Sequence, residues 1–176
     1  MKTYAKLEAG ALRVMGRVPN ISNPTERRRA AYAAAHGFKE LVAVESPGRY
    51  YRKGYAETED AITETWTPWE LENAKKDALA EVQGRLDAVL DARATIPCGG
   101  FPAGIVYDRN ALINAGGLAE GDTFIDAADG IHTLEAQDVA AVTAALKGYR
   151  QGLYAQATQR RAAIAAATTV DELPQD

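Results

Sequence analysis

Hydrophobic and polar positions alternate over short stretches in the first third of the chain, a pattern typical of strands. Two such stretches between residues 4 and 18 are separated by Glu8, Ala9 and Gly10 and predict a β-hairpin. Further strands are predicted at residues 38–44, 50–55 and 61–66. An acidic tip at 57–60 joins the last two. We therefore expect a small sheet in this region.

A helix is predicted between the hairpin and the later strands. Asn23 is a suitable cap, and Pro24 fits the first helical position. Glu26 stands where the carboxylate of a capping box reaches back to the cap. The helix should then run through basic and alanine residues and stop at Gly37. Together with the strands, it predicts a small α+β domain over residues 1–66.

A second helix has the clearest start signal in the sequence. Thr67 can cap it, Pro68 fits its first turn, and Glu70 can reciprocate the cap. Large apolar residues then recur with the spacing of a packed or coiled helix, at Leu79, Val82, Leu86 and Val89. The pattern lasts about two heptads, which is too short to define a coiled coil. A connecting helix over 67–96 is expected, packed within the chain or in an oligomeric stalk.

The C-terminal part predicts a mixed domain over 97–176. Its expected elements are a linker at 97–103, a strand at 104–107, a short helix from Asp108 to Gly117, a hairpin about Asp129 and Gly130, and a long helix from Leu134 to Ala167 capped by Thr133. Ala144, Gly148 and Gly152 stand four residues apart on the long helix, so they form a bare stripe that another helix can approach closely. That partner is either the helix at 68–94 or a second copy of the chain.

The composition fits an α+β fold with thin helical cores. Alanine supplies 35 of the 176 residues, whereas Leu, Ile, Val and Phe together supply 34. A net charge of only −4 argues against disorder despite this low bulk. The alanine excess lies mainly in the predicted helices, which are therefore expected to need neighbours.

Several classes of protein are excluded at this stage. The sequence has no apolar run of about 18 residues, so no membrane insertion is expected. No signal peptide is visible, and Cys98 is the only cysteine, which favours synthesis in a cytoplasm. The net charge is +2 over residues 1–70 and −6 over the rest of the chain. Neither part therefore has the basic excess of a nucleic-acid-binding surface.

Candidate catalytic groups are few. His36 and His132 have no partner ligands in sequence, and Cys98 lacks a basic neighbour that would activate its thiol. Three aspartates lack the spacing of a calcium-binding loop and are expected to stabilise turns. They are Asp122, Asp126 and Asp129. No enzymatic activity, cofactor or metal site is predicted.

An aromatic set is the best candidate for recognition. Its members are Tyr50, Tyr51, Tyr55, Trp66 and Trp69. Aromatic side chains with polar tips suit protein interfaces and can stack on sugar rings. The alternative is that they pack the N-terminal sheet.

Residues 72–173 resemble a domain of unknown function found in tail and tail-fibre-associated proteins of bacteriophages and prophages. The resemblance rests on an ordered series of features that starts with an alanine-rich helix. Three segments follow it: Gly104-Ile-Val-Tyr-Asp108, Ile113-Asn-Ala-Gly-Gly117 and Phe124-Ile-Asp-Ala-Ala-Asp-Gly-Ile-His-Thr-Leu134. A long helix containing Tyr149 and Tyr154 comes next, and the series closes with Ile164-Ala-Ala-Ala-Thr-Thr-Val-Asp-Glu-Leu173. More loosely, Pro24-Thr-Glu26 and Gly48-Arg-Tyr-Tyr-Arg-Lys-Gly-Tyr55 are similar to leading segments of prophage tail proteins.

The resemblance implies a structural role in a phage tail, as an adaptor or subunit of the baseplate or tail fibre. It implies other tail and fibre proteins as partners, a location in the virion, and no active-site residues. A homo-oligomer is expected, with a trimer among the arrangements allowed. Two other roles stay open: a tail-fibre assembly chaperone absent from the virion, and a carbohydrate-binding module that recognises a receptor through the aromatic set. The candidate interface also includes the apolar residues of the 67–96 helix, and Gly148 and Gly152.

Overall fold

The computed structural model describes residues 2–18 and 24–175 and divides the chain into two compact units. The first is Met1–Leu71 with Gln175–Asp176, and the second is Glu72–Pro174. Helices and sheets are both present, which confirms the predicted α+β class. This division differs from the predicted boundaries at 66 and 96, because nearly all of the helix expected to connect two domains belongs to the second unit.

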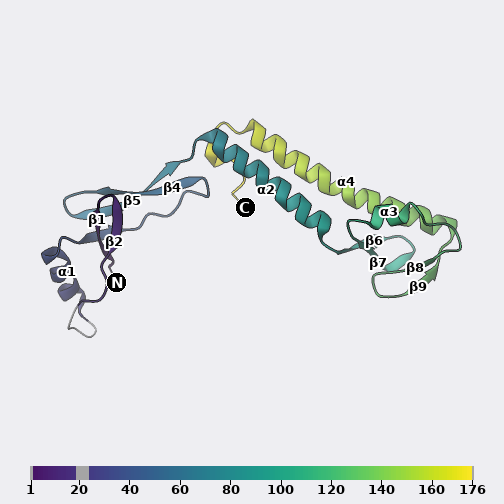
Figure 1. Cartoon of the computed structure of the whole chain (residues 1–176), viewed down its shortest axis with the longest axis horizontal. Coiled ribbons are helices and arrows are strands. Elements are labelled where there is room, and N and C mark those ends of the chain that lie inside the picture. Colours follow the sequence, from purple (N-terminus) through teal and green to yellow (C-terminus); the bar gives the residue numbers. More distant parts are fainter. Residues whose placement is uncertain (1, 19–23, 176) are drawn as a thin grey trace. The chain divides into compact units, whose positions relative to one another are not determined.

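A five-stranded sheet forms most of the first unit, in the order β2-β1-β3-β5-β4 (Figure 1). Its strands are β1 (Tyr4–Glu8), β2 (Ala11–Val14), β3 (Lys39–Val42), β4 (Tyr51–Glu57) and β5 (Ala61–Pro68). Neighbouring strands are antiparallel except β3 and β5, which are parallel. Ala9 and Gly10 have φ angles of 51° and 81°, the left-handed pair that closes a two-residue hairpin. The hairpin predicted there is confirmed.

The helix α1 (Glu26–Ala35) begins later than predicted. Its N-cap is Thr25, whose hydroxyl oxygen accepts a hydrogen bond from the backbone N–H of Arg28 at 3.4 Å. The prediction that Pro24 is the first helical residue is therefore wrong. The predicted cap, Asn23, lies outside the described residues.

The end of α1 and its inner face attach it to the sheet. Gly37 has a φ of 71° just after the helix, as the predicted stop requires. Tyr4 of β1 packs with Met15 and Ala33 in a small buried cluster. The Tyr4 hydroxyl donates a hydrogen bond to the Glu26 carboxylate at 3.0 Å, so this carboxylate serves the sheet contact rather than a capping box.

The strand β5 continues through the predicted start of the second helix. Thr67 and Pro68 pair with Arg52 and Tyr51 of β4. Proline is tolerated at this point because β3 pairs only with the first three residues of β5, so the end of β5 has one neighbour. The predicted cap at Thr67 and first helical position at Pro68 are therefore wrong, and the helix α2 (Leu71–Asp91) begins later.

The second unit is built on two long helices. The helices α2 and α4 (Ala136–Ala166) lie side by side (Figure 1). Near the start of α2, the Lys75 ammonium donates to the carbonyl oxygen of Ala165 at 3.2 Å. Further along, the Arg161 guanidinium donates to the side-chain oxygen of Gln83 at 2.5 Å. The start of α2 therefore lies against the end of α4, and the helices are antiparallel.

The start of α4 has a different cap from the predicted one. Glu135, not Thr133, is the N-cap, and its side chain accepts from the backbone N–H of Asp138. The Asp138 carboxylate accepts from the Glu135 backbone N–H at 2.9 Å and completes a capping box. The helix thus begins two residues after Leu134 and ends at Ala166, close to its predicted end.

Short elements complete the second unit. They are β6 (Ala94–Cys98), β7 (Phe101–Tyr107), α3 (Ala111–Ala115), β8 (Thr123–Ile125), β9 (Ile131–Thr133) and a 3₁₀ turn at Val170–Glu172. The linker predicted at 97–103 is instead part of the β6–β7 hairpin, in which Gly100 has a φ of 85°. The short helix predicted after Asp108 is the five-residue α3. The hairpin predicted about Asp129 and Gly130 is confirmed as β8–β9.

The core of the second unit lies where β7 meets α4. Ile105 and Tyr107 of β7 are almost fully buried, as are Val142 and Leu146 of α4. The Tyr107 ring meets Tyr149 edge to face, with ring centroids 4.8 Å apart. In the part of the chain that the structure describes, none of the helices has the length and apolar character needed to cross a membrane.

Candidate interaction surfaces

The aromatic set of the first unit does not form one exposed platform. Tyr50 is only 1% exposed and meets Trp69 edge to face at 5.9 Å. The backbone N–H of Trp69 also donates to the carbonyl oxygen of Tyr50 at 2.8 Å. Trp69 itself is 38% exposed, whereas Tyr51 lies in β4 opposite Pro68. Part of the set therefore packs the sheet, and the buried Tyr50 ring is not available to a sugar.

Trp66 and Tyr55 surround an ion pair on the same face of β4 and β5. The Lys53 ammonium lies 5.6 Å from the Trp66 ring centroid and 5.9 Å from that of Tyr55. It also lies 2.5 Å from the Glu64 carboxylate, which is nearly buried. The hydrogen bond from Lys53 holds the pKa of Glu64 below its usual value. The Trp66 indole N–H donates to the Val44 carbonyl at 3.0 Å, so this edge of the ring is also engaged.

The apolar residues predicted along α2 divide into two groups. Val82 and Leu86 are buried, as expected, but Leu79 is 40% exposed and Val89 is 39% exposed. The buried residues of α2 instead recur every four positions, at Ala74, Ala78, Val82, Leu86 and Leu90. The predicted spacing counted only large residues, whereas alanines supply two of the five buried positions. Sequence reasoning missed Ala74, Ala78 and Leu90, which the four-residue repeat could have indicated.

The glycine stripe of α4 does not contact α2. Gly148 and Gly152 are exposed, and a Cβ built on either one would meet no atom within 4 Å. No residue between Leu146 and Ala157 is buried. Of the two partners left open by the sequence, the helix at 68–94 does not cover these glycines within the described chain.

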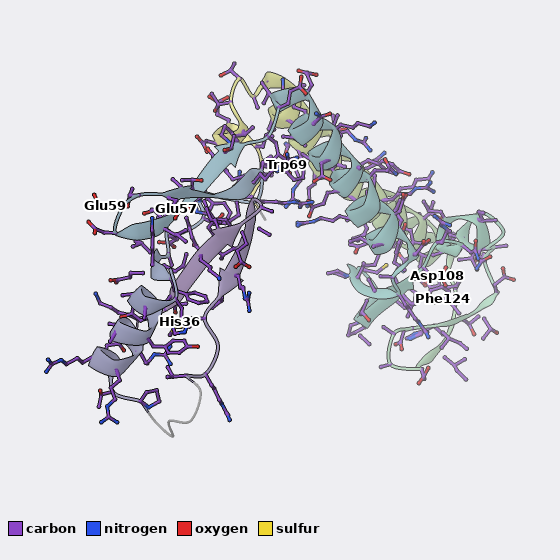
Figure 2. All side chains as sticks on the ribbon, turned by 60° about the vertical axis from the view of Figure 1, so that its left-hand side comes forward. His36, Glu57, Glu59, Trp69, Asp108 and Phe124 are labelled. Atoms are coloured by element: carbon purple, nitrogen blue, oxygen red, sulfur yellow. The ribbon has the colours of Figure 1, made fainter. Side chains whose placement is uncertain are left out.

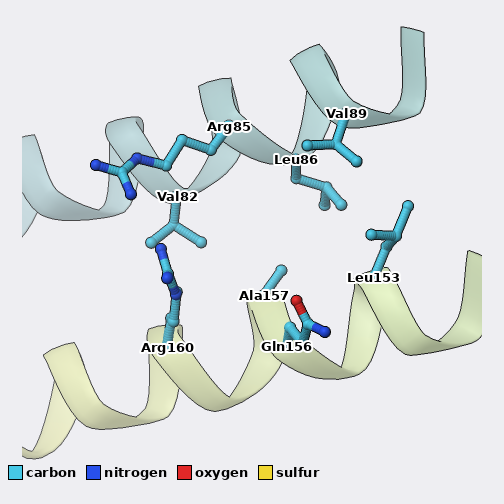
Figure 3. A pocket seen from close by; sticks show the side chains of 8 residues that line it. All are labelled: Val82, Arg85, Leu86, Val89, Leu153, Gln156, Ala157 and Arg160. Atoms are coloured by element: carbon cyan, nitrogen blue, oxygen red, sulfur yellow. The ribbon is translucent and has the colours of Figure 1, made fainter. Parts of the chain in front are cut away.

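A groove lies between the middle parts of α2 and α4 (Figure 3). Its apolar walls are Val82, Leu86 and Val89 on α2, and Leu153 and Ala157 on α4. Arg85, Gln156 and Arg160 supply its polar lining. Figure 3 shows Leu153 pointing toward Val89 and Ala157 pointing toward Leu86.

The interhelical groove has a volume of about 250 Å³. The sizes of the side chains that face each other across it account for this volume. Ala157 is too short to fill the space in front of Leu86, so the helices meet without closing the gap. Of the lining residues on α4, Ala157 was not singled out from the sequence, because the predicted spacings counted only large apolar residues. The interhelical groove is thus lined mainly by apolar side chains, with one arginine on each helix.

A larger cavity lies near the start of α4 and is lined in part by α3. Its volume is about 440 Å³. Its lining includes Ile105 of β7, Ala115 of α3, Phe124 and Ile125 of β8, and Leu146 of α4. Asp108, Asn114, Asp129 and Arg93 add polar groups; Asp108 and Phe124 are labelled in Figure 2. We call this space the α3 cavity. No pattern in the sequence indicated the α3 cavity, because its walls come from elements far apart in the chain.

The β8–β9 hairpin beside the α3 cavity is held by one buried carboxylate. Asp126 accepts hydrogen bonds from the backbone N–H groups of Ala128 and Gly130, at 2.9 and 2.8 Å. Its other oxygen lies 2.8 Å from Nε2 of His132. The hydrogen bond with His132, followed by those from the backbone, holds the pKa of Asp126 below its usual value.

The other two predicted turn aspartates, Asp122 and Asp129, also lie at turns. Asp122 accepts from the backbone N–H of Ala119 at 2.8 Å, and Asp129 has a φ of 63° at the hairpin turn. The turn role predicted for Asp122 and Asp126 is thus confirmed by their hydrogen bonds, and Asp129 lies in the hairpin turn itself. His132 also meets Phe101 edge to face at 5.0 Å, a contact that the sequence did not indicate.

The described residues contain no group of three or more His, Cys, Asp or Glu side chains arranged to hold a metal ion. Burial and the nearby charge of Asp138 raise the pKa of the Cys98 thiol, which disfavours the thiolate form. His36 lies at the end of α1, where its ring stacks on Tyr32 with centroids 4.0 Å apart. The candidate binding surfaces of the second unit are the interhelical groove and the α3 cavity.

No family model, no curated protein and no solved structure matches the chain.

Proposed function

We propose that the protein is a non-enzymatic structural component of a bacteriophage tail, an adaptor or subunit of the baseplate or tail fibre. The resemblance of residues 72–173 to a domain of phage tail proteins, noted above from its motifs, supports the phage context. The geometry of α2 and α4 supports the assembly role. In this proposal its partners are other tail and fibre proteins and further copies of itself, and its place is the virion.

The interhelical groove is the observation that carries the proposal. Only α2 and α4 supply the walls of the groove, so apolar positions such as Val89 and Leu153 are only partly covered there. Removing apolar surface from water contributes about 25 cal/mol per Å², so a further helix laid along the groove would stabilise both partners. Subunits of an assembly supply such helices to each other.

A second copy of the chain is the proposed source of that helix. The middle of α4 has no buried residue between Leu146 and Ala157, and its glycines let another backbone approach closely. Closed symmetric assemblies are the usual outcome of self-association, and a trimer is one of them.

Sedimentation equilibrium at micromolar concentration tests self-association. We expect the wild-type chain to form an oligomer and Val89→Lys to weaken it, because this lysine would enter the groove. Leu79→Lys is the matched control, since Leu79 is on the same helix and almost equally exposed but does not line the groove. A strictly monomeric wild-type chain, or equal effects of the two substitutions, would count against the proposal.

Mass spectrometry of purified phage particles tests the virion role. A structural component is present in the particle, whereas an assembly chaperone is absent from it. The carbohydrate-binding alternative has less support, because Tyr50 is buried and the Trp66 indole N–H is already bonded within the sheet.

A further inference from the structure

Three isoleucines of the second unit are unusually exposed. Ile113 of α3 is 76% exposed, Ile125 of β8 is 57% exposed, and Ile131 of β9 is 75% exposed. Ile125 and Ile131 are opposite each other in the antiparallel pair, so their side chains share one face of the hairpin. We call Ile125 and Ile131 the isoleucine patch. Exposed bulky apolar residues gathered on neighbouring elements mark interaction surfaces.

The isoleucine patch borders the α3 cavity. Ile125 belongs to both, and Ile131 pairs with it across the hairpin, whereas Ile113 does not line the cavity. At about 440 Å³, the cavity is within the size range of pockets that bind ligands. Its walls include Ile105, Phe124 and Leu146, which suit an apolar group. An exposed apolar surface beside a cavity with apolar walls is an arrangement that receives a bulky anchor side chain of a partner.

The charge around the cavity specifies the partner further. Residues 91–138, the segment that supplies most of the cavity lining, contain eight acidic and two basic residues, a net charge of −6 for the segment. Asp108 and Asp129 line the cavity, whereas Arg93 is its one basic lining residue among those described. An acidic surface of this kind attracts and orients a basic partner.

We propose that the α3 cavity and the isoleucine patch bind a basic segment of a partner protein, which inserts a bulky apolar side chain into the cavity. This inference rests on the proposed assembly role but concerns a different surface from the interhelical groove. A second copy is a poorer occupant. The basic cluster Arg27–Arg29 lies between Glu26 and Ala30, and the nearby Tyr32 is half-buried and stacked on His36.

Titration of the isotope-labelled full chain with synthetic peptides, followed by NMR, tests the proposal. The probe is a short peptide in which Lys and Arg flank a central Leu-Trp pair. One control peptide has Glu in place of each basic residue, and another has Ala in place of Leu and Trp. We expect only the first peptide to bind, to shift amide signals of α3, β8 and β9, and to bind more weakly as salt is added.

Substitutions on the protein make the test specific. We expect Ile131→Lys to weaken binding of the basic peptide by about tenfold or more, because it removes apolar contact and adds a repelling charge. Val14→Lys is the matched control, since Val14 is also an exposed β-branched strand residue, but in the first unit. It should leave the affinity unchanged.

Several results would overturn the proposal. They are no binding of the basic peptide, equal binding of the alanine peptide, or no effect of Ile131→Lys. If Ile131→Lys instead dissociates an oligomer of the wild-type chain, the patch binds a second copy and the proposed partner is wrong. Failure of this proposal can be distinguished from failure of the assembly role. The assembly role is tested separately, by self-association of wild type and Val89→Lys and by the presence of the protein in phage particles.

Discussion

The carboxylate of Asp126 and the imidazole of His132 meet at 2.8 Å across the β8–β9 hairpin. Asp126 is buried, and it also accepts two backbone hydrogen bonds from the turn that it closes. His132 in turn contacts the ring of Phe101. One carboxylate thus joins the hairpin turn, the second strand and the β6–β7 hairpin, and fixes the wall that carries Ile125.

We expect Asp126→Asn to destabilise the second unit, in a pH-dependent way. The pKa of Asp126 is held below its ordinary value of 3.8, so the folded state favours the ionised form. The stability that it contributes is therefore present above that ordinary value and is lost as the pH falls through the lower folded pKa. Thermal unfolding should show a lower midpoint for Asp126→Asn than for wild type at neutral pH, and a shrinking difference in acid.

Asp129→Asn is the matched control for this experiment. Asp129 is in the same turn, and asparagine tolerates its φ of 63°. The folded structure gives no reason for a large change in its unfolding midpoint. Equal midpoints for Asp126→Asn and wild type at neutral pH would mean that the contact with His132 does not stabilise the hairpin.

Gly104→Ala should be among the more damaging single substitutions in β7. Gly104 has a φ of 78°, and a Cβ there would lie 2.6 Å from the carbonyl oxygen of Ile96. We expect a loss of about 2–4 kcal/mol in the free energy of unfolding, measured by chemical denaturation. Gly99→Ala, in open space at the β6–β7 turn, should change it by less than about 0.5 kcal/mol. Similar losses for both would contradict this account of Gly104.

Predictions from the sequence were most accurate where tertiary contacts did not oppose the local preference. The turn at Ala9 and Gly10 needs left-handed backbone, and the flanking strands confirm it. Thr67 and Pro68 form an equally good helix start locally, yet they pair with Arg52 and Tyr51 as a strand. Pairing across the sheet outweighed the local preference, and a single sequence does not show that competition.

The candidate surfaces were predictable only in part. Val82 and Leu86 were identified correctly as buried residues of α2, but Ala157 was not, although it faces Leu86 and leaves the groove open. The α3 cavity joins Ile105 to Leu146, which are distant in sequence. Its existence depends on how these elements pack, which periodicity within one helix or strand does not encode.

Gly148→Ala and Gly152→Ala test whether the bare stripe on α4 is a contact between chains. Neither glycine has a neighbour within 4 Å of a built Cβ, so alanine fits the isolated helix without a clash. Each substitution should raise the free energy of unfolding of a single chain by about 0.5–1 kcal/mol. Gly84→Ala in α2 is the matched control, because its Cβ position is also open.

If another α4 packs closely on the stripe, the double variant Gly148→Ala with Gly152→Ala should stabilise the single chain yet weaken self-association in sedimentation equilibrium. Gly84→Ala should then stabilise without affecting association. Unchanged association of the double variant would leave the interhelical groove, and not the glycine stripe, as the contact between copies.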